Sequence, residues 1–177
     1  FGTEKRGIDI PLVKPTFETN VSGIYIAGEL GGMGLIRKGV DQGARAIQSI
    51  RKHKGSANEL DVVIVGAGPA GISASLAAKE AGLRFVTIEQ EDSLGGSIYH
   101  YPRRKLAMTA PMTLPIVGKF NKYEISKEEL LTFWSRITRD NGIKVNFTER
   151  MEAITKAAGG FVVKTSKASY KTKNILL

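Results

Sequence analysis

The sequence contains no cysteine and no long apolar run. Without cysteine, the chain itself can carry no disulfide, no Cys-ligated zinc or iron–sulfur site and no thiol redox chemistry. No run approaches the roughly 20 apolar residues that a membrane-spanning helix needs. Residues 1–8 also lack the apolar core of a signal peptide. We therefore expect a cytoplasmic protein with no membrane partner and no metal site.

Basic residues outnumber acidic residues, but they are not concentrated in one part of the sequence. Lys and Arg number 26 against 17 Asp and Glu, which gives a formal net charge of +9. Most of the basic residues occur in ones and twos, and they form no stripe. We therefore expect a solvated basic surface that attracts anionic cofactors, and no nucleic-acid partner. A length of 177 residues, with 42% hydrophobic and 24% charged residues, suits one globular α/β domain.

A glycine-rich loop joins a predicted strand to a predicted helix. The run LDVVIV at 60–65 is typical of a strand buried on both faces, and a helix is expected from Pro69 to about residue 81. Between them, GAGPAG at 66–71 fits the G-x-G-x-x-G pattern of dinucleotide-binding loops. Its glycines would permit a tight turn, a close approach of the backbone to a pyrophosphate and close helix–strand packing. The cofactor-binding residues predicted here are Gly66, Gly68, Pro69, Ala70 and Gly71. A tight turn that binds no ligand is the alternative.

A carboxylate follows the next predicted strand. The run RFVTIE at 84–89 ends in Glu89, about 20 residues beyond the glycine loop. A carboxylate at this place can accept hydrogen bonds from ribose hydroxyl groups and repels a 2′-phosphate. Glu89 therefore favours FAD or NAD over NADP as the bound nucleotide.

A second strand, glycine turn and helix precede this unit. GIYIAGE at 23–29 is predicted as a buried strand, and apolar residues at helical spacing predict a helix over 35–52. A short linker at 55–59 leads to the strand at 60–65. Because the helix of a β–α–β unit returns the chain to the starting edge of the sheet, this linker is long enough to place both strands in one parallel sheet.

The C-terminal part is expected to be mixed. Residues 92–120 are predicted as irregular, and a helix is predicted from Ser126 to about Asp140, with Ser126 as N-cap and Glu129 reaching back in a capping box. IKVNFTE at 143–149 is predicted as a strand. The remaining residues are predicted as strands of a small antiparallel meander, with turns at Gly159-Gly160 and near Lys167.

Two separate stretches show a family resemblance. Glu89 is followed by Leu94-Gly95-Gly96, and TNVSGIYIAGELGG spans 19–32. Together they resemble the FAD domain of the pyridine-nucleotide flavoprotein reductases, the thioredoxin-reductase-like group. The resemblance implies an α/β, Rossmann-like FAD/NAD(P)-binding domain whose parallel sheet is flanked by helices and a small β-meander. It also implies that Gly95, Gly96 and Gly28 belong to the cofactor site and that Glu29, in place of the family's Asp, contacts the ribityl chain.

The order of the two stretches is inverted relative to this family. There the G-x-G-x-x-G half comes first, a pyridine-nucleotide domain is inserted, and the G-I-Y-A-x-G-D half closes the chain. Here the closing segment, 1–54, precedes the dinucleotide-binding part, 60–177, and the inserted domain is missing. With a first residue of Phe1 rather than Met, we expect a piece cut across the junction of two tandem flavoprotein modules; a circular permutant is the alternative. In either case we expect the two parts to form one domain.

The resemblance implies the FAD-binding part of an NAD(P)H-dependent flavoprotein oxidoreductase. FAD is the expected cofactor, and NAD(P)H is expected to bind to a domain that this chain lacks. The alternative is a non-catalytic or regulatory module that binds FAD or NAD. The redox-active cysteine pair of the family's disulfide reductases is absent, so no catalytic residue is assigned. His100, between Tyr99 and Tyr101, is a candidate acid–base group or a loop histidine in an aromatic patch. A homo-oligomer is compatible with the sequence.

Overall fold

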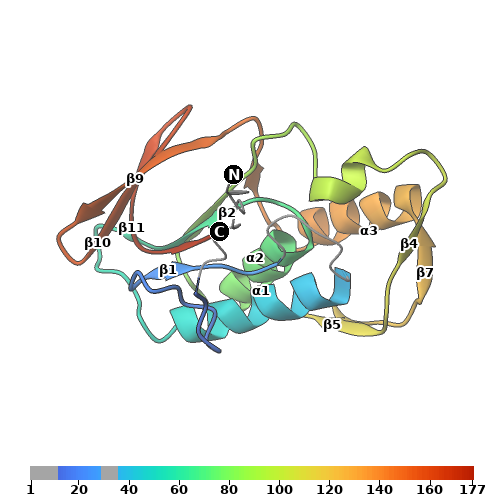
Figure 1. Cartoon of the computed structure of the whole chain (residues 1–177), viewed down its shortest axis with the longest axis horizontal. Coiled ribbons are helices and arrows are strands. Elements are labelled where there is room, and N and C mark those ends of the chain that lie inside the picture. The colour runs from blue at the N-terminus through green and yellow to red at the C-terminus, as the bar shows by residue number, and fades with distance from the viewer. Residues whose placement is uncertain (1–11, 29–35) are drawn as a thin grey trace, which may run out of the picture.

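A central sheet organises the chain (Figure 1). The computed structural model describes residues 12–28 and 36–177. In chain order the sheet strands are β1 (Ile24–Tyr25), β2 (Leu60–Val65), β3 (Phe85–Ile88), β8 (Val145–Asn146), β9 (Met151–Ala157), β10 (Gly160–Thr165) and β11 (Ser169–Leu176). Within the described ranges their order in space is β8-β3-β2-β11-β10-β9, and β1 pairs with β11. The pairs β1–β11, β11–β2, β2–β3 and β3–β8 are parallel, whereas β9, β10 and β11 form an antiparallel meander. The predicted Rossmann-like α/β fold is confirmed.

Two helices cover one face of this sheet. They are α1 (Ile36–Ile50) and α2 (Pro69–Glu80). In α1 the buried side chains recur at helical spacing, which produces an apolar stripe toward the core. The stripe packs on the sheet together with α2, in a cluster that includes Ile47, Ile50, Val62, Ile64, Ala74, Ala78 and Leu176. No helix in the described part of the chain is both long enough and apolar enough to cross a membrane.

On the other face of the sheet, a side chain of β2 packs against side chains of the meander strands. In β2, Val62 and Ile64 point toward the helices, whereas Val63 between them belongs to a separate cluster with Phe161, Val163 and Ile175. This alternation follows from the period of two residues in a β-strand. Burial on both faces explains why β2 is an uninterrupted apolar run rather than an alternating one.

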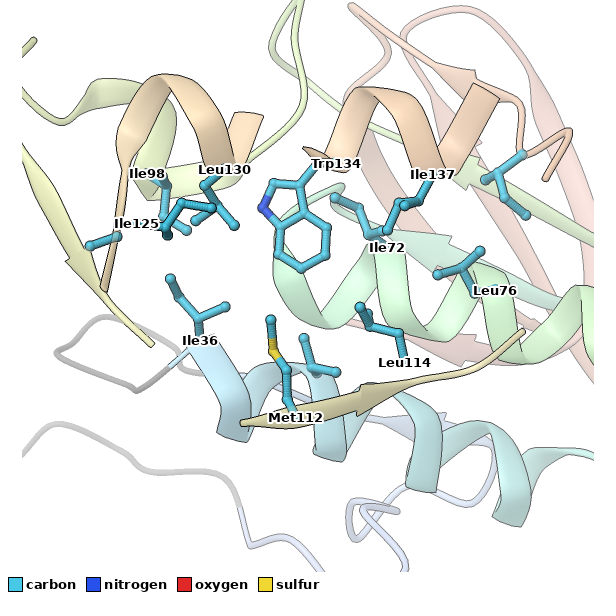
Figure 2. Packing of buried hydrophobic residues seen from close by; sticks show 13 residues of the cluster. Ile36, Ile72, Leu76, Ile98, Met112, Leu114, Ile125, Leu130, Trp134 and Ile137 are labelled. Atoms are coloured by element: carbon cyan, nitrogen blue, oxygen red, sulfur yellow. The ribbon is translucent and has the colours of Figure 1, made fainter. Parts of the chain in front are cut away.

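The segment predicted as irregular contains short regular elements. These are the 3-10 helix η1 (Gly96–His100) and the strands β4 (Leu106–Met108), β5 (Met112–Leu114) and β6 (Gly118–Phe120), followed by β7 (Glu124–Ser126). Strand β4 pairs with β7, and β5 pairs with β6. They enclose, with α1, α2 and α3 (Lys127–Asp140), a second core around the fully buried Trp134 (Figure 2). The prediction of an irregular segment was wrong here because strands of three residues carry too little periodicity to be recognised.

Helix α3 begins as predicted, with one difference at its cap. Ser126 Oγ accepts the backbone N–H of Glu129, with 3.2 Å between the two atoms. The Glu129 carboxylate lies 3.9 Å from Lys122 Nζ. The first half of the predicted capping box is thus present, whereas the carboxylate of its second residue is engaged by a neighbouring lysine.

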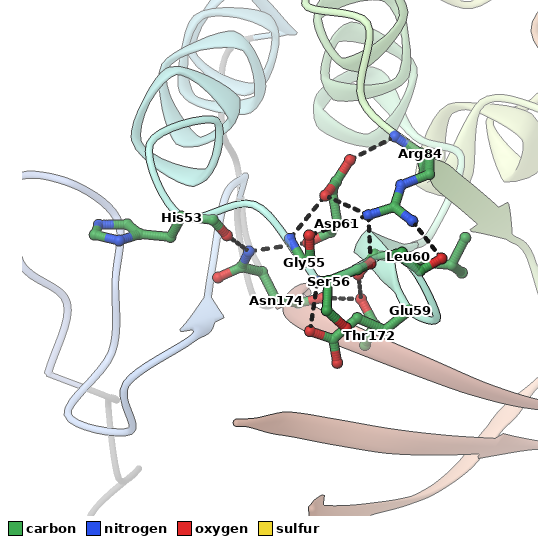
Figure 3. Close-up of polar contacts among 10 residues, drawn as sticks. His53, Gly55, Ser56, Glu59, Leu60, Asp61, Arg84, Thr172 and Asn174 are labelled. Atoms are coloured by element: carbon green, nitrogen blue, oxygen red, sulfur yellow. Dashed lines mark hydrogen bonds and ion pairs between the residues drawn. The ribbon is translucent and has the colours of Figure 1, made fainter. Parts of the chain in front are cut away.

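Polar contacts fix the connection between α1 and β2 (Figure 3). Asp61 accepts the backbone N–H groups of Gly55 and Arg84, each at 2.8 Å, and the Arg84 guanidinium lies 3.4 Å from its Oδ1. Asn174 Nδ2 donates to the carbonyl oxygens of His53, at 2.8 Å, and Asp61, at 2.9 Å. Burial alone would raise the pKa of Asp61, but the hydrogen bonds from Arg84 and Gly55 and the Arg84 charge hold it below its ordinary value.

Candidate functional site

The glycine loop lies at the carboxyl end of β2. Gly66 directly follows the strand with a φ of +107°, a left-handed conformation that glycine adopts without steric cost. Gly68 is the N-cap of α2, no side chain caps the helix there, and Pro69 occupies its first turn. The first backbone N–H groups of a helix have no partner within it, and the helix dipole makes this end positive. This end of α2 can therefore receive an anion such as a pyrophosphate.

The three glycines of the loop have different surroundings. A Cβ atom placed on Gly71 would overlap the carbonyl oxygen of Gly66, so any side chain there would push α2 away from the loop. A Cβ atom on Gly66 would meet nothing within 4 Å, and one on Gly68 would meet only Gly96 Cα, at 3.8 Å. Gly71 is thus required by packing within the protein, whereas Gly66 and Gly68 leave open space beside the backbone.

Glu89 is placed beside this loop, at the end of β3. Its side chain is buried, and Oε1 accepts the N–H of Ala67 at 2.9 Å while Oε2 accepts the N–H of Glu91 at 3.0 Å. Each carboxylate oxygen has two lone pairs, so one acceptor position remains on each. The same group can therefore hold the loop and accept hydrogen bonds from two ribose hydroxyl groups.

The second glycine pair packs directly against the first loop. The Gly95 N–H donates to the carbonyl oxygen of Ala67 at 3.0 Å. Gly95 and Gly96 have φ values of +110° and +58°, and a Cβ atom on Gly96 would lie 3.3 Å from Gly68 Cα. Two loops that are almost thirty residues apart in the sequence thus form one glycine-lined surface.

A cavity of about 500 Å³ opens between these segments. It is lined by Val65, Gly66, Gly68, Ile88, Glu89, Gln90, Glu91, Gly96, His100, Glu149, Arg150 and Met151. Cofactor sites of open parallel sheets lie at this edge, and this volume is within the range of ligand pockets. The open space beside Gly66 and Gly68, the free helix end and the Glu89 carboxylate fit the pyrophosphate and ribose of a dinucleotide.

Sequence reasoning missed a second buried acid in this cavity. Glu149 donates its backbone N–H to the carbonyl oxygen of Glu89 at 2.9 Å, and its Oε2 accepts from Thr165 Oγ1 at 2.9 Å and Tyr170 OH at 2.7 Å. Burial, together with the bond to Glu149, raises the pKa of Tyr170, so its hydroxyl remains a donor. The available signal was that Glu149, like Glu89, is the last residue of a run predicted as a strand, although the strand β8 itself ends at Asn146.

The histidine considered as an acid–base group lies at the rim of the cavity. His100 is exposed; its Nε2 is 4.0 Å from Glu91 Oε1 and its ring meets the Tyr99 ring edge-on at 5.4 Å. His100 thus lines the cavity and also belongs to an aromatic pair.

Two cofactor-site residues, Gly28 and Glu29, were predicted in the closing segment. Gly28 has a φ of +85°, and a Cβ atom on it would be 3.1 Å from Ala70 Cβ, at the first turn of α2. Gly28 is therefore brought to the glycine loop. Glu29 lies outside the described residues.

Comparison with known proteins agrees with this geometry. Residues 63–177, well over half of the chain, match the family described as pyridine nucleotide-disulphide oxidoreductase. The chain belongs to this family. The segment matched contains the glycine loop from Gly66 onward, Glu89, the Gly95-Gly96 pair and the meander. Membership makes the chain an FAD-binding redox flavoprotein module.

Individual relatives show the same relationship. Ferredoxin–NADP reductase 3 of Lysinibacillus sphaericus is 34% identical over 119 residues, which cover 66% of this chain and 31% of that protein. The oxidoreductase CzcO of Bacillus subtilis is 23% identical over 121 residues, which cover 66% of this chain and 35% of that protein. The chain thus spans about a third of the length of these curated relatives.

Solved structures of other proteins share the fold of this chain. A bacillithiol disulfide reductase from Staphylococcus aureus has a TM-score of 0.60 at 22% identity, over 67% of this chain and 38% of that chain. A flavin-containing monooxygenase from Stenotrophomonas maltophilia has a TM-score of 0.58 at 17% identity, over 68% of this chain and 38% of that chain. At such identities the likeness concerns the fold.

Proposed function

We propose that the chain holds FAD for an NAD(P)H-dependent oxidoreductase, with the adenosine half of the cofactor in the cavity beside Glu89. The observation that carries this proposal is the position of the Glu89 carboxylate, which touches the glycine loop at the carboxyl edge of the sheet. Glu89 would hold the ribose, and the free N–H groups at the start of α2 would hold the phosphates. The carboxylate excludes a 2′-phosphate by charge repulsion, which favours FAD over an NADP-type nucleotide.

We also propose that residues 1–54 and 60–177 form one cofactor-binding domain. Two contacts support this. The parallel pairing of β1 with β11 matches Tyr25 with Leu176, in the middle of the sheet. Helix α1 lies so close to α2 that a Cβ atom on Gly43 would overlap the carbonyl oxygen of Ala70, and Ser73 Oγ donates to the carbonyl oxygen of Val40 at 2.6 Å.

In this proposal the chain binds and orients the cofactor. When bound, FAD supplies the hydride and electron chemistry. Glu89 accepts the ribose hydroxyl groups, the start of α2 offsets the pyrophosphate charge, and Gly95 and Gly96 allow the cofactor to lie against the backbone. A domain outside this chain would bind NAD(P)H.

The proposal is tested by identifying the ligand of the purified chain. We expect mass spectrometry of the released ligand to show FAD, and the loaded chain to have a flavin absorption spectrum. Release of NAD, or of no nucleotide together with no binding of added FAD, would contradict it. Adding NADH to the loaded chain in the absence of oxygen distinguishes a reductase module from the non-catalytic alternative, provided that the missing domain is supplied.

A further inference from the structure

A second cavity lies at the edge of the sheet opposite to the glycine loop. It has a volume of about 540 Å³ and is lined by the linker between α1 and β2, by the turn between β9 and β10, and by β11. The linker leads into the amino end of β2, where Leu60 pairs with Thr172. The cavity beside Glu89 lies at the carboxyl end of β2, and the two cavities share no lining residue. The family match begins at residue 63, so the linker also lies outside the matched segment.

Three lysines and one acid line this second cavity. Lys171 and Lys173 are two positions apart on β11, so their side chains leave the same face of the sheet, and the fold brings Lys54 of the linker to them. The acid is Glu59, and its Oε1 accepts the N–H of Ser56 at 2.9 Å. None of the three lysines forms an ion pair with another residue in the described ranges. The cavity therefore carries an excess of positive charge.

The linker wall of this cavity is held by hydrogen bonds within the protein (Figure 3). The Arg84 guanidinium donates to the carbonyl oxygens of Ser56, at 2.6 Å, and Ala57, at 3.0 Å. The Asp61 carboxylate accepts the N–H of Gly55 at 2.8 Å. A wall that is fixed before a ligand arrives lowers the entropic cost of binding.

The opposite wall fixes one of the three ammonium groups. Lys173 Nζ donates to the carbonyl oxygen of Gly159, in the turn between β9 and β10, with 2.8 Å between the two atoms. An ammonium group has three donors, so two remain for a ligand. Lys54 and Lys171 are exposed, and their long side chains can close on an anion that Lys173 receives.

We propose that this cavity binds a small compound through a multiply charged phosphate group such as a diphosphate. Lysine binds phosphate as a point charge, and three ammonium groups suit an anion with more than one negative charge. The volume is within the range of small-molecule pockets, and these lysines gather in one hollow instead of forming the stripe of a nucleic-acid-binding face. The bound anion ties the linker to the meander. This inference does not rest on the proposed function.

Inorganic diphosphate is the probe for this site. It is titrated calorimetrically into the full chain, with and without FAD, and we expect binding that FAD does not displace. In the presence of FAD, the amide NMR signals of Gly55 and Gly159 are expected to shift on addition of diphosphate. Binding that FAD abolishes would place the diphosphate at the glycine loop and overturn the inference. Failure of the unmodified chain to bind diphosphate would overturn it too.

A pair of double variants separates this site from the general charge of the protein. Lys54→Gln/Lys171→Gln is expected to lower diphosphate affinity about five-fold or more and to leave FAD affinity unchanged. The matched control is Lys156→Gln/Lys164→Gln, which removes the same charge from exposed positions of the meander outside the cavity. It is expected to change diphosphate affinity by no more than about two-fold. Equal losses in the two double variants would overturn the inference. If diphosphate binds as expected and FAD does not bind, the proposed function alone is wrong.

Discussion

The carboxylate of Glu89 accepts the backbone N–H of Ala67, with 2.9 Å between Oε1 and N. The two residues are 22 positions apart and lie just beyond the carboxyl ends of the neighbouring parallel strands β2 and β3. Through this bond the acid that is expected to bind ribose also sets the conformation of the loop that is expected to bind pyrophosphate. Glu89 therefore has a structural role in the protein and a binding role toward the cofactor, and the two roles can be separated by substitution.

Glu89→Ala is expected to reduce both stability and FAD affinity. Leaving the buried N–H group of Ala67 without an acceptor costs about 1–3 kcal/mol in the free energy of unfolding, whereas the part-buried N–H group of Glu91 can bond to water instead. Loss of the ribose contacts is expected to lower FAD affinity roughly ten-fold or more. Glu89→Gln keeps one acceptor oxygen, so its stability and FAD affinity are expected to lie between those of the unmodified chain and of Glu89→Ala. Urea unfolding and FAD titration measure these effects; an FAD dissociation constant unchanged in Glu89→Ala would show that the ribose is bound elsewhere.

Gly68→Val and Gly71→Ala are expected to fail in opposite ways. The side chain added at Gly68 meets open space, so the chain is expected to keep its fold and lose FAD binding, because the valine occupies the place of the pyrophosphate. The methyl group added at Gly71 collides with the Gly66 carbonyl oxygen, and the expected loss in free energy of unfolding is about 1–3 kcal/mol. Circular dichroism during heating and calorimetric titration distinguish the two. A folded Gly68→Val variant with full FAD affinity would refute the assignment of this loop.

The stability of the chain is expected to fall at acid pH in part through Asp61. Its pKa in the folded protein lies below the ordinary value of 3.8, so the ionised group stabilises the folded state above pH 3.8. This contribution is lost as the pH falls from 3.8 through the lowered pKa of the folded state. We expect the difference in free energy of unfolding between the unmodified chain and Asp61→Asn to shrink over this range. A difference that stays constant between neutral pH and pH 3 would contradict the prediction.

A shortened chain that begins at Ser56 tests whether the two parts form one domain. The shortened chain lacks β1 and α1, and their loss uncovers apolar residues of the sheet and of α2, including Ala74, Ala78 and Leu176. We expect such a chain to be poorly soluble, or to bind FAD no more tightly than ADP, whereas the full chain prefers FAD. A shortened chain with the stability and FAD affinity of the full chain would show that residues 1–55 are not needed for the site.

The sequence was sufficient to predict the elements whose formation depends on interactions between residues close together in the chain. The apolar run of β2, the glycine loop from Gly66 to Gly71 and the cap at Ser126 depend on side chains and backbone conformations within a few residues of one another. The meander was predictable for the same reason, because alternating strands and the turn at Gly159 are close in the chain. At the site, Glu89 could be placed because a strand end fixes where the next side chain lies.

Tertiary structure alone decided which distant groups meet. The bond from Gly28 to Gln42 and the cluster of Glu149 with Thr165 and Tyr170 are contacts that no local sequence pattern predicts. The short strands from β4 to β7 form because they close over Trp134, and no three-residue segment is stable in isolation. The sequence by itself thus determined the Rossmann-like fold and the dinucleotide loop, since turns and periodicity depend on backbone sterics. The pairing of β1 with β11 and the contact of α1 with α2 required packing of the whole chain, because only buried area shared between distant segments offsets the entropy of bringing them together.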